Sequence, residues 1–302
     1  MNTSVNICGV NFKNPVTTAS GTCGFGRDFL NFYKPEQLGA IVVKGLTLAP
    51  RLGNPPVRIA ETPAGMLNSI GLQNPGVEKF IAEELPWLKE RNATVIANIA
   101  GSCIDDYCEM ARILSDTSVD MIEMNISCPN VKEGGVAFGT NPATVEKITS
   151  SVKKVCTKPL IVKLSPNVTD ITQTAHAAEV GGADCLSLIN TLLGMRIDIK
   201  TKRPVLHNNV GALSGPAVKP VAVRMVWQVR KVTDLPIIGM GGIASWEDAV
   251  EFLMAGANAV SIGCAAFSNP SVPLEVIDGI EKYMEANNIS DISEITGSVI
   301  PY

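Results

Sequence analysis

The chain alternates short apolar segments with longer amphipathic ones almost from end to end. The apolar segments are continuous, which is typical of parallel strands that are buried on both faces. Eight strands are expected, at Pro15–Ala19, Ala40–Lys44, Ala93–Asn98, Met121–Asn125, Leu160–Leu164, Cys185–Ile189, Pro236–Met240 and Ala259–Ile262. A helical pattern follows each strand, at Arg27–Leu38, Val77–Arg91, Asp105–Leu114, Pro142–Val155, Ile171–Val180, Val218–Lys231, Trp246–Met254 and Leu274–Ala286. A small hairpin at Val5–Val10 is expected before the first strand.

These strand–helix units predict a (β/α)₈ TIM barrel, formed by residues 1–302 as a single domain. The rival architecture is a doubly wound sheet. It usually has a G-x-G-x-x-G sequence in its first strand–helix turn, and this chain has none there. Long insertions follow strands two, four and six, and those after strands two and six span Gly45–Pro75 and Asn190–Gly215. Because they leave the carboxyl ends of strands, we expect them on the C-terminal face, where barrel active sites form.

The composition argues against several classes of protein. Hydrophobic residues make up 46% of the chain and charged residues 18%, so we expect a large core and little disorder. The net charge of -4 does not indicate the positively charged surface that is typical of nucleic-acid-binding proteins. No apolar run reaches the roughly 18 residues that a membrane span needs. The N-terminal residues show neither a secretory signal nor a hydrophobic or amphipathic extension, so we expect neither export nor a membrane-associated enzyme.

Eight cysteines are scattered along the chain, and no two of them form a C-x-x-C pair. This distribution suits reduced thiols in a cytoplasmic protein better than a disulfide framework. It also argues against an iron–sulfur cluster or a structural zinc ion held by this chain. With two histidines in the whole sequence, no metal site is predicted.

Polar residues and glycines gather where the predicted strands end, and a barrel places its functional side chains there. These positions hold Ser20, Lys44, Asn98, Asn125, Lys163, Asn190, Gly241, Gly242, Gly263 and Cys264. Lysine is rarely buried without a partner, so two lysines at one barrel mouth indicate an anionic ligand. The asparagines offer uncharged donors and acceptors, which suit a flat heterocycle with imide-like edges. The glycines after strands seven and eight favour a phosphate bound by backbone N–H groups over simple tight turns.

Cys128 is the candidate for proton transfer on this face. It lies in the loop after the fourth strand, and Pro129 disfavours a helical conformation for it. The strand ends carry no Ser/His/Asp arrangement and no pair of carboxylates, which argues against hydrolysis and phosphoryl transfer. A small apolar side chain that fills a pocket is the alternative interpretation of this thiol.

Taken together, these segments resemble the dihydroorotate dehydrogenase family over essentially the whole chain. The matching segments are Ala19–Thr22, Val43–Gly45, Asn68–Asn74, Asn125–Asn130, Ile189–Thr191 and Gly239–Ile243. The resemblance implies a (β/α)₈ barrel that binds FMN at its C-terminal face. It also implies oxidation of (S)-dihydroorotate to orotate in de novo pyrimidine (UMP) biosynthesis.

The resemblance also indicates a subclass. Soluble members of the family use a cysteine base, and Val131–Gly139 looks like the NAD-linked subclass. That subclass implies a partner subunit with FAD and a [2Fe–2S] cluster, in a heterotetramer built on a homodimer of this chain. Three alternatives stay open: a fumarate-reducing homodimer of the same family, a flavin oxidoreductase of other dihydropyrimidines, and a phosphate-binding barrel without redox function.

Carried over position by position, the resemblance implies the role of each residue. Cys128 is the base that takes the C5 proton, and Lys163 stabilises negative charge on the reduced flavin ring. The FMN contacts are assigned to Ser20, Lys44, Gly45, Asn98, Asn125, Lys163, Ile189, Gly215, Gly241, Gly242, Gly263 and Cys264. The substrate contacts are assigned to Lys44, Asn68, Ser69, Ile70, Gly71, Leu72, Asn125, Asn190 and Thr191.

Overall fold

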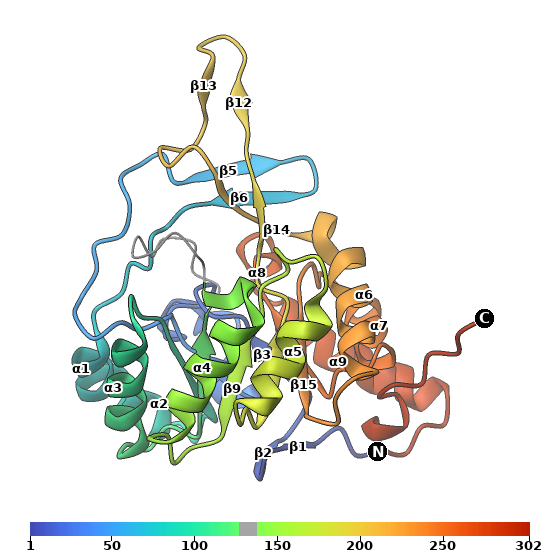
Figure 1. Ribbon diagram of the computed structural model, residues 1–302. Coiled ribbons are helices and arrows are strands. Elements are labelled where there is room, and N and C mark those ends of the chain that lie inside the picture. Colours follow the sequence, from blue (N-terminus) through green and yellow to red (C-terminus); the bar gives the residue numbers. More distant parts are fainter. Residues whose placement is uncertain (127–137) are drawn as a thin grey trace.

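The computed structural model describes residues 1–126 and 138–302 and shows a barrel of parallel strands (Figure 1). Eight strands pair in the order β3-β16-β15-β10-β9-β8-β7-β4. A bridge between Thr17 and Ala40 joins the two outer strands. The strands are β3 (Val16–Thr18), β4 (Ile41–Val42), β7 (Val95–Ile99), β8 (Met121–Asn125), β9 (Leu160–Lys163), β10 (Cys185–Leu188), β15 (Ile237–Met240) and β16 (Ala259–Ile262). The eight predicted strands and the TIM-barrel fold are confirmed.

Helices pack around the outside of this barrel (Figure 1). They are α1 (Val77–Lys79), α2 (Leu85–Lys89), α3 (Ile104–Ser115), α4 (Pro142–Lys153), α5 (Ile171–Val180), α6 (Lys219–Arg230), α7 (Trp246–Met254), α8 (Ala265–Ser268) and α9 (Val272–Ala286). Side chains cap several of them in the usual way: Asn141, Asp170 and Ser245 each accept a backbone N–H in the first turn that follows. In the described part of the chain, no helix is both long enough and apolar enough to cross a membrane.

The helix predicted at Arg27–Leu38 is wrong. The structure has two separate 3₁₀ turns there, Arg27–Phe29 and Pro35–Gln37. Pro35 explains the break, because proline disfavours the helical conformation for the residue before it. Lys34 accordingly has φ −98° and ψ 140°, which is extended backbone.

The helix predicted at Val77–Arg91 is present but irregular. A π-helical turn at Phe80–Glu84 separates α1 from α2. Pro86, in the first turn of α2, has no N–H to donate to the preceding turn of the helix. The wider π turn just before it accommodates this missing donor.

The insertions after the second and sixth barrel strands form one antiparallel sheet, which we call the roof sheet. Its strands pair in the order β11-β14-β6-β5, where β5 is Ile59–Thr62, β6 is Gly65–Asn68, β11 is Leu192–Gly194 and β14 is Gly211–Ser214. The roof sheet lies above the barrel mouth, and the hairpin of β12 (Ile197–Asp198) and β13 (Arg203–Pro204) projects beyond it (Figure 1). Most of the insertion after the fourth strand lies outside the described residues.

The opposite end of the barrel is closed by the predicted N-terminal hairpin. Its strands are β1 (Val5–Ile7) and β2 (Val10–Phe12), paired antiparallel. Ile7 and Phe12 are fully buried against inward-facing residues of the barrel strands. That lower interior layer consists of Ala40, Val42, Ile96, Met121, Ile161, Cys185, Ile238 and Ala259, and Met240, two positions beyond Ile238, packs on top of it. The lower barrel is therefore a packed apolar core.

Candidate active site

A cavity of about 850 Å³ opens at the carboxyl ends of the barrel strands, between these ends and the roof sheet. It is lined by every predicted cofactor or substrate residue that the structure describes: Ser20, Lys44, Gly45, Asn68, Ser69, Ile70, Gly71, Leu72, Asn98, Asn125, Lys163, Ile189, Asn190, Thr191, Gly215, Gly241, Gly242, Gly263 and Cys264. The fold thus brings together residues that are spread over most of the chain. Which of them contact a ligand stays a prediction.

Cys128 lies outside the described residues, as do the other residues from Ser127 to Ala137. The chain before it is described as far as Ile126, and Asn125 lines the cavity. The role of Cys128 as a base therefore stays a prediction from the sequence.

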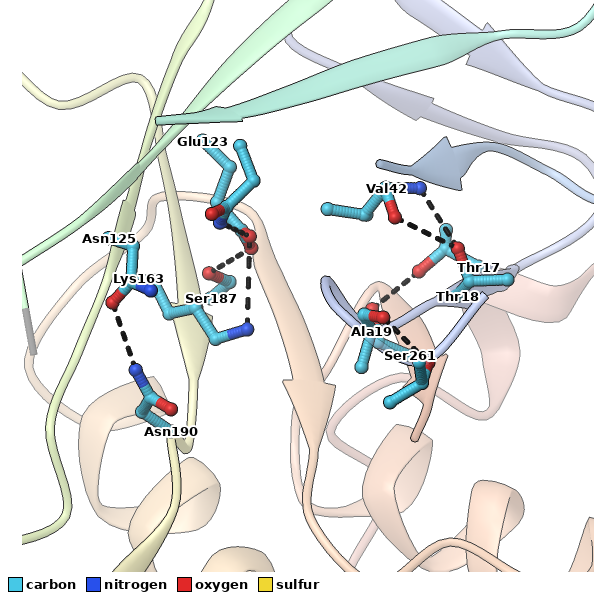
Figure 2. Close-up of polar contacts among 12 residues, drawn as sticks. Thr17, Thr18, Ala19, Val42, Glu123, Asn125, Lys163, Ser187, Asn190 and Ser261 are labelled. Carbon is cyan, nitrogen blue, oxygen red and sulfur yellow. Dashed lines mark hydrogen bonds and ion pairs between the residues drawn. The ribbon is translucent and has the colours of Figure 1, made fainter. Parts of the chain in front are cut away.

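The barrel interior changes from apolar to polar just below the cavity. Side chains of a strand alternate between its faces, so residues two positions beyond the apolar layer also point inward. This upper layer includes Thr17, Asn98, Glu123, Lys163, Ser187 and Ser261, all of them buried. The hydroxyl oxygens of Thr17 and Ser261 lie 2.5 Å apart on neighbouring strands (Figure 2). The cavity floor is therefore a hydrogen-bonding surface.

Glu123 is the centre of the polar layer, and sequence reasoning missed it. Its Oε2 atom accepts a hydrogen bond of 2.5 Å from Asn98 Nδ2, and its Oε1 atom accepts one of 2.7 Å from the Ser187 hydroxyl. The predicted site residues lie at the ends of the expected strands, whereas Glu123 lies two positions before the end of β8. The available signal was a charged residue inside an apolar strand, in the same inward register as Asn125.

Lys163 connects this network to the cavity. Its side chain is 6% exposed, and its Nζ atom lies 3.8 Å from Glu123 Oε2 (Figure 2). That separation is an ion pair without a direct hydrogen bond. Unlike Glu123, Lys163 is a cavity-lining residue, so its cationic charge is presented to whatever the cavity binds.

Asn98 presents a hydrogen-bond acceptor that is not used within the described protein. Its amide nitrogen must face Glu123, because only the nitrogen can donate to a carboxylate. Its Oδ1 atom is buried and has no hydrogen-bond partner among the described residues. A Cβ atom at Gly45 would lie 2.8 Å from this oxygen, so glycine keeps the space beside it open. A buried acceptor of this kind is costly unless a ligand N–H group satisfies it.

The glycines after β15 are required by both backbone conformation and packing. Gly241 and Gly242 have φ values of 122° and 84°. A Cβ atom on Gly242 would lie 2.8 Å from the carbonyl oxygen of Gly215 and 2.8 Å from Cβ of Lys219. Because glycine has no side chain, a ligand can approach the backbone N–H groups of this turn closely, as phosphate sites require.

An ion-pair network supports this turn from behind. Lys219 Nζ lies 2.6 Å from Asp248 Oδ1 and 2.8 Å from Glu251 Oε1. The Oδ2 atom of Asp248 accepts hydrogen bonds from the backbone N–H groups of Ala244 and Ser245. Burial alone raises the pKa of Asp248, but the hydrogen bonds from Lys219 and Ala244 outweigh it, so the net pKa is lowered.

The side of the cavity near the roof sheet carries the predicted substrate residues. Asn68 ends β6 and is followed by Ser69, whose buried hydroxyl has no hydrogen-bond partner among the described residues. Opposite, Asn190 Nδ2 donates to Asn125 Oδ1 over 3.0 Å (Figure 2). The Oδ1 atom of Asn190 accepts a hydrogen bond from the Thr191 N–H. This arrangement offers amide and hydroxyl groups to a polar, uncharged ring edge.

Three observations fit FMN in this cavity. The unsatisfied Asn98 oxygen is a suitable acceptor for the N–H of an imide edge. The Gly241–Gly242 turn suits a phosphate, and Lys163 suits a ring that gains negative charge.

Within the described residues, no group of three or more His, Cys, Asp or Glu side chains is placed to hold a metal ion.

Comparison with known proteins gives one consistent family. A sequence model described as dihydroorotate dehydrogenase matches residues 2–284. A protein of Alkaliphilus metalliredigens named dihydroorotate dehydrogenase B (NAD(+)), catalytic subunit, is 58% identical over 99% of this chain and 99% of its own length. A protein of the same name from Thermoanaerobacter pseudethanolicus is 56% identical, again over 99% of each chain.

A solved structure agrees at the level of the fold. The structure of DHODH from Eimeria tenella in complex with ferulenol superimposes with a TM-score of 0.81 at 24% identity. The match covers 98% of this chain and 88% of that one.

Proposed function

The chain belongs to the dihydroorotate dehydrogenase family, and on that premise we propose that it oxidises (S)-dihydroorotate to orotate in de novo pyrimidine biosynthesis, with FMN as its cofactor. The observation that carries this proposal is the shared cavity. All described residues assigned to the cofactor or the substrate line it, although they come from strand ends that are far apart in the sequence.

The reaction removes two hydrogens from neighbouring carbons of the substrate ring. Cys128, as thiolate, takes the proton from C5, and the C5–H electron pair forms the new double bond to C6. Bound FMN would supply the acceptor for the hydride that leaves C6. Lys44 and Asn68 hold the substrate, and Asn125 and Asn190 orient its ring edge.

Two residues of the polar layer act on the cofactor. Asn98 Oδ1 would accept a hydrogen bond from the ring edge, which would satisfy an oxygen that has no partner among the described residues. Lys163 stabilises the negative charge that the ring gains on reduction, because a fixed cation is effective in a buried site.

The electrons pass on to NAD+ through a second subunit. The names of the relatives specify NAD(+) and a catalytic subunit, which supports this acceptor over fumarate. We expect the partner to hold FAD and a [2Fe–2S] cluster and to bind a homodimer of this chain as a heterotetramer. The scattered cysteines support a cytoplasmic location.

The test of the proposed activity is spectroscopic. The purified chain should be yellow, with flavin absorbance that is bleached by dihydroorotate without oxygen, and it should release orotate. Dihydrouracil serves as the comparison, since it lacks the substrate carboxylate. A colourless protein, or equal bleaching by both compounds, contradicts the proposal.

The test of the acceptor is co-purification from the native source. A partner with FAD and iron–sulfur absorbance, and NAD+ reduction by the complex alone, is the expected result. Fumarate reduction by the isolated chain at a comparable rate contradicts it.

A further inference from the structure

Glu123 is a buried carboxylate that the reaction scheme above leaves unused. It is 1% exposed and does not line the cavity, so it does not meet substrate or cofactor directly. Burial of a carboxylate costs several kcal/mol unless it is paired and hydrogen-bonded. A hydrophobic side chain would complete the strand at lower cost, so the carboxylate calls for a functional explanation.

Its contacts reach two strands that carry predicted flavin residues. Asn98 Nδ2 donates to Glu123 Oε2, and Lys163 Nζ lies 3.8 Å from the same oxygen. The strand register explains the arrangement: Asn98 lies directly beside Glu123, and Lys163 lies beside Asn125, two positions further along β8. Glu123 therefore contacts both the amide of Asn98 and the ammonium of Lys163. Figure 2 shows its ion pair with Lys163.

The negative charge of Glu123 offsets part of the positive charge that Lys163 presents at the cavity wall. Both groups are buried, so water screens their fields weakly. A lone cation beside a flavin stabilises the reduced ring, which carries negative charge, and so raises its reduction potential. A carboxylate 3.8 Å behind that cation opposes the effect.

We propose that Glu123 is a positioning and charge-balancing residue, which orients Asn98 and Lys163 and lowers the reduction potential of the bound FMN. This inference rests on the proposed function, because it takes FMN as the occupant of the cavity. A low potential suits the proposed electron path, since NAD+ is a weak oxidant and a reduced flavin that is too stable would not pass electrons toward it.

The experiment is a redox titration of bound FMN in the wild type and in Glu123→Gln. Glutamine keeps the shape of glutamate and removes the charge. The expected result is a more positive potential, by about 30 mV for a tenfold change in a two-electron equilibrium. Glu123→Asp, which keeps the charge, should stay closer to the wild type than Glu123→Gln. A potential in Glu123→Gln that is unchanged or more negative overturns the inference.

Removal of one partner of a buried ion pair is strongly destabilising, so Glu123→Gln alone can fail to fold. The test is therefore repeated with Lys163→Gln as the starting protein. When Glu123→Gln is added to it, neither position carries a charge. The double variant should have a more positive potential than Lys163→Gln alone, because the field of the carboxylate is removed in either background. An unchanged or more negative potential in the double variant overturns the inference as well.

The wild type separates this inference from the proposed function. Wild-type protein that binds no FMN overturns the proposed function. Wild-type protein that binds FMN and oxidises dihydroorotate, with no positive shift in the glutamine variants, overturns only the role of Glu123.

Discussion

Asn190 Nδ2 donates to Asn125 Oδ1 over 3.0 Å and so joins the ends of β10 and β8 at the mouth of the barrel. The backbone carbonyl of Asn125 also accepts a hydrogen bond of 2.8 Å from the Tyr107 hydroxyl. The residue is therefore held from two sides. It is also the last residue of the strand that precedes Cys128, so the chain enters the loop of the proposed base from an anchored point.

Replacement of that base should separate binding from chemistry. Cys128→Ala should retain FMN and lose at least ~10²-fold in dihydroorotate oxidation, which is typical for loss of a general base. The check is kcat with dihydroorotate, together with the flavin content of each preparation. Cys128→Ser is the matched control, and it should retain more activity than alanine because a hydroxyl can still accept a proton. Turnover near the wild-type value in Cys128→Ala contradicts the assignment.

The wild-type pH profile tests the same residue in another way. A free thiol has a pKa of about 8.5, and the thiolate is the form that accepts a proton. The rate of flavin reduction by dihydroorotate should therefore rise as pH increases through that range. A rate that falls over this range contradicts a thiolate base.

Loss of Lys163 should affect the flavin itself. Lys163→Ala should weaken FMN binding or slow flavin reduction by about tenfold or more, since a buried charge is removed from the cavity wall. Lys79→Ala is a suitable control, because Lys79 is also 3.8 Å from a carboxylate, that of Glu83, but is 57% exposed. Exposed pairs contribute little, so the control should behave as the wild type. Equal FMN affinity and equal reduction rate in both variants contradict the role of Lys163.

Alanine at Gly242 should damage the proposed phosphate site. Gly242 has φ 84°, and its added Cβ would lie 2.8 Å from the Gly215 carbonyl oxygen. Backbone strain of this kind costs about 1–3 kcal/mol, and displacement of the turn should lower FMN affinity further. Gly9→Ala separates backbone strain from steric contact, because Gly9 has φ 86° but nothing lies within 4 Å of the added Cβ. Gly9→Ala should lose stability while keeping FMN affinity. If both variants bind FMN equally well, Gly242 has no special role.

The ion pair behind that turn predicts a pH-dependent stability. Asp248→Asn should lower the free energy of unfolding by about 1–2 kcal/mol near neutral pH, through loss of a helix cap and charge-assisted hydrogen bonds. The pKa of Asp248 is lowered in the folded state, so its contribution is complete above the unfolded value, ~3.9, and is lost as pH falls below it. Urea unfolding of both proteins at neutral and acid pH should therefore show a difference that shrinks in acid.

The control for that variant is Asp278→Asn. Asp278 pairs with Lys282 at 2.6 Å, but both side chains are largely exposed, so stability should stay near that of the wild type. A stability difference for Asp248→Asn that is constant over this pH range would assign its effect to packing.

Most of the barrel was predictable because its signals are local. Continuous apolar strands and amphipathic helices reflect which faces each segment buries, and that information lies within a few neighbouring residues. The positions of Lys163, Asn125 and Gly241 at strand ends followed directly from the barrel hypothesis. The wrong prediction of one helix at Arg27–Leu38 also has a local cause. Pro35 disfavours a helical conformation for the residue before it, although the spacing of apolar residues is helical.

The sequence by itself thus determined the barrel, the face of its site and the family resemblance. Only the tertiary structure decided how distant segments meet. It paired β6 with β14, which places Asn68 beside Ala212, and it converted two insertions into the roof sheet. It also placed Glu123 against Lys163 and Asn98, a contact between three strands. Pairing between distant segments depends on barrel closure and strand register, and no local periodicity encodes either of them.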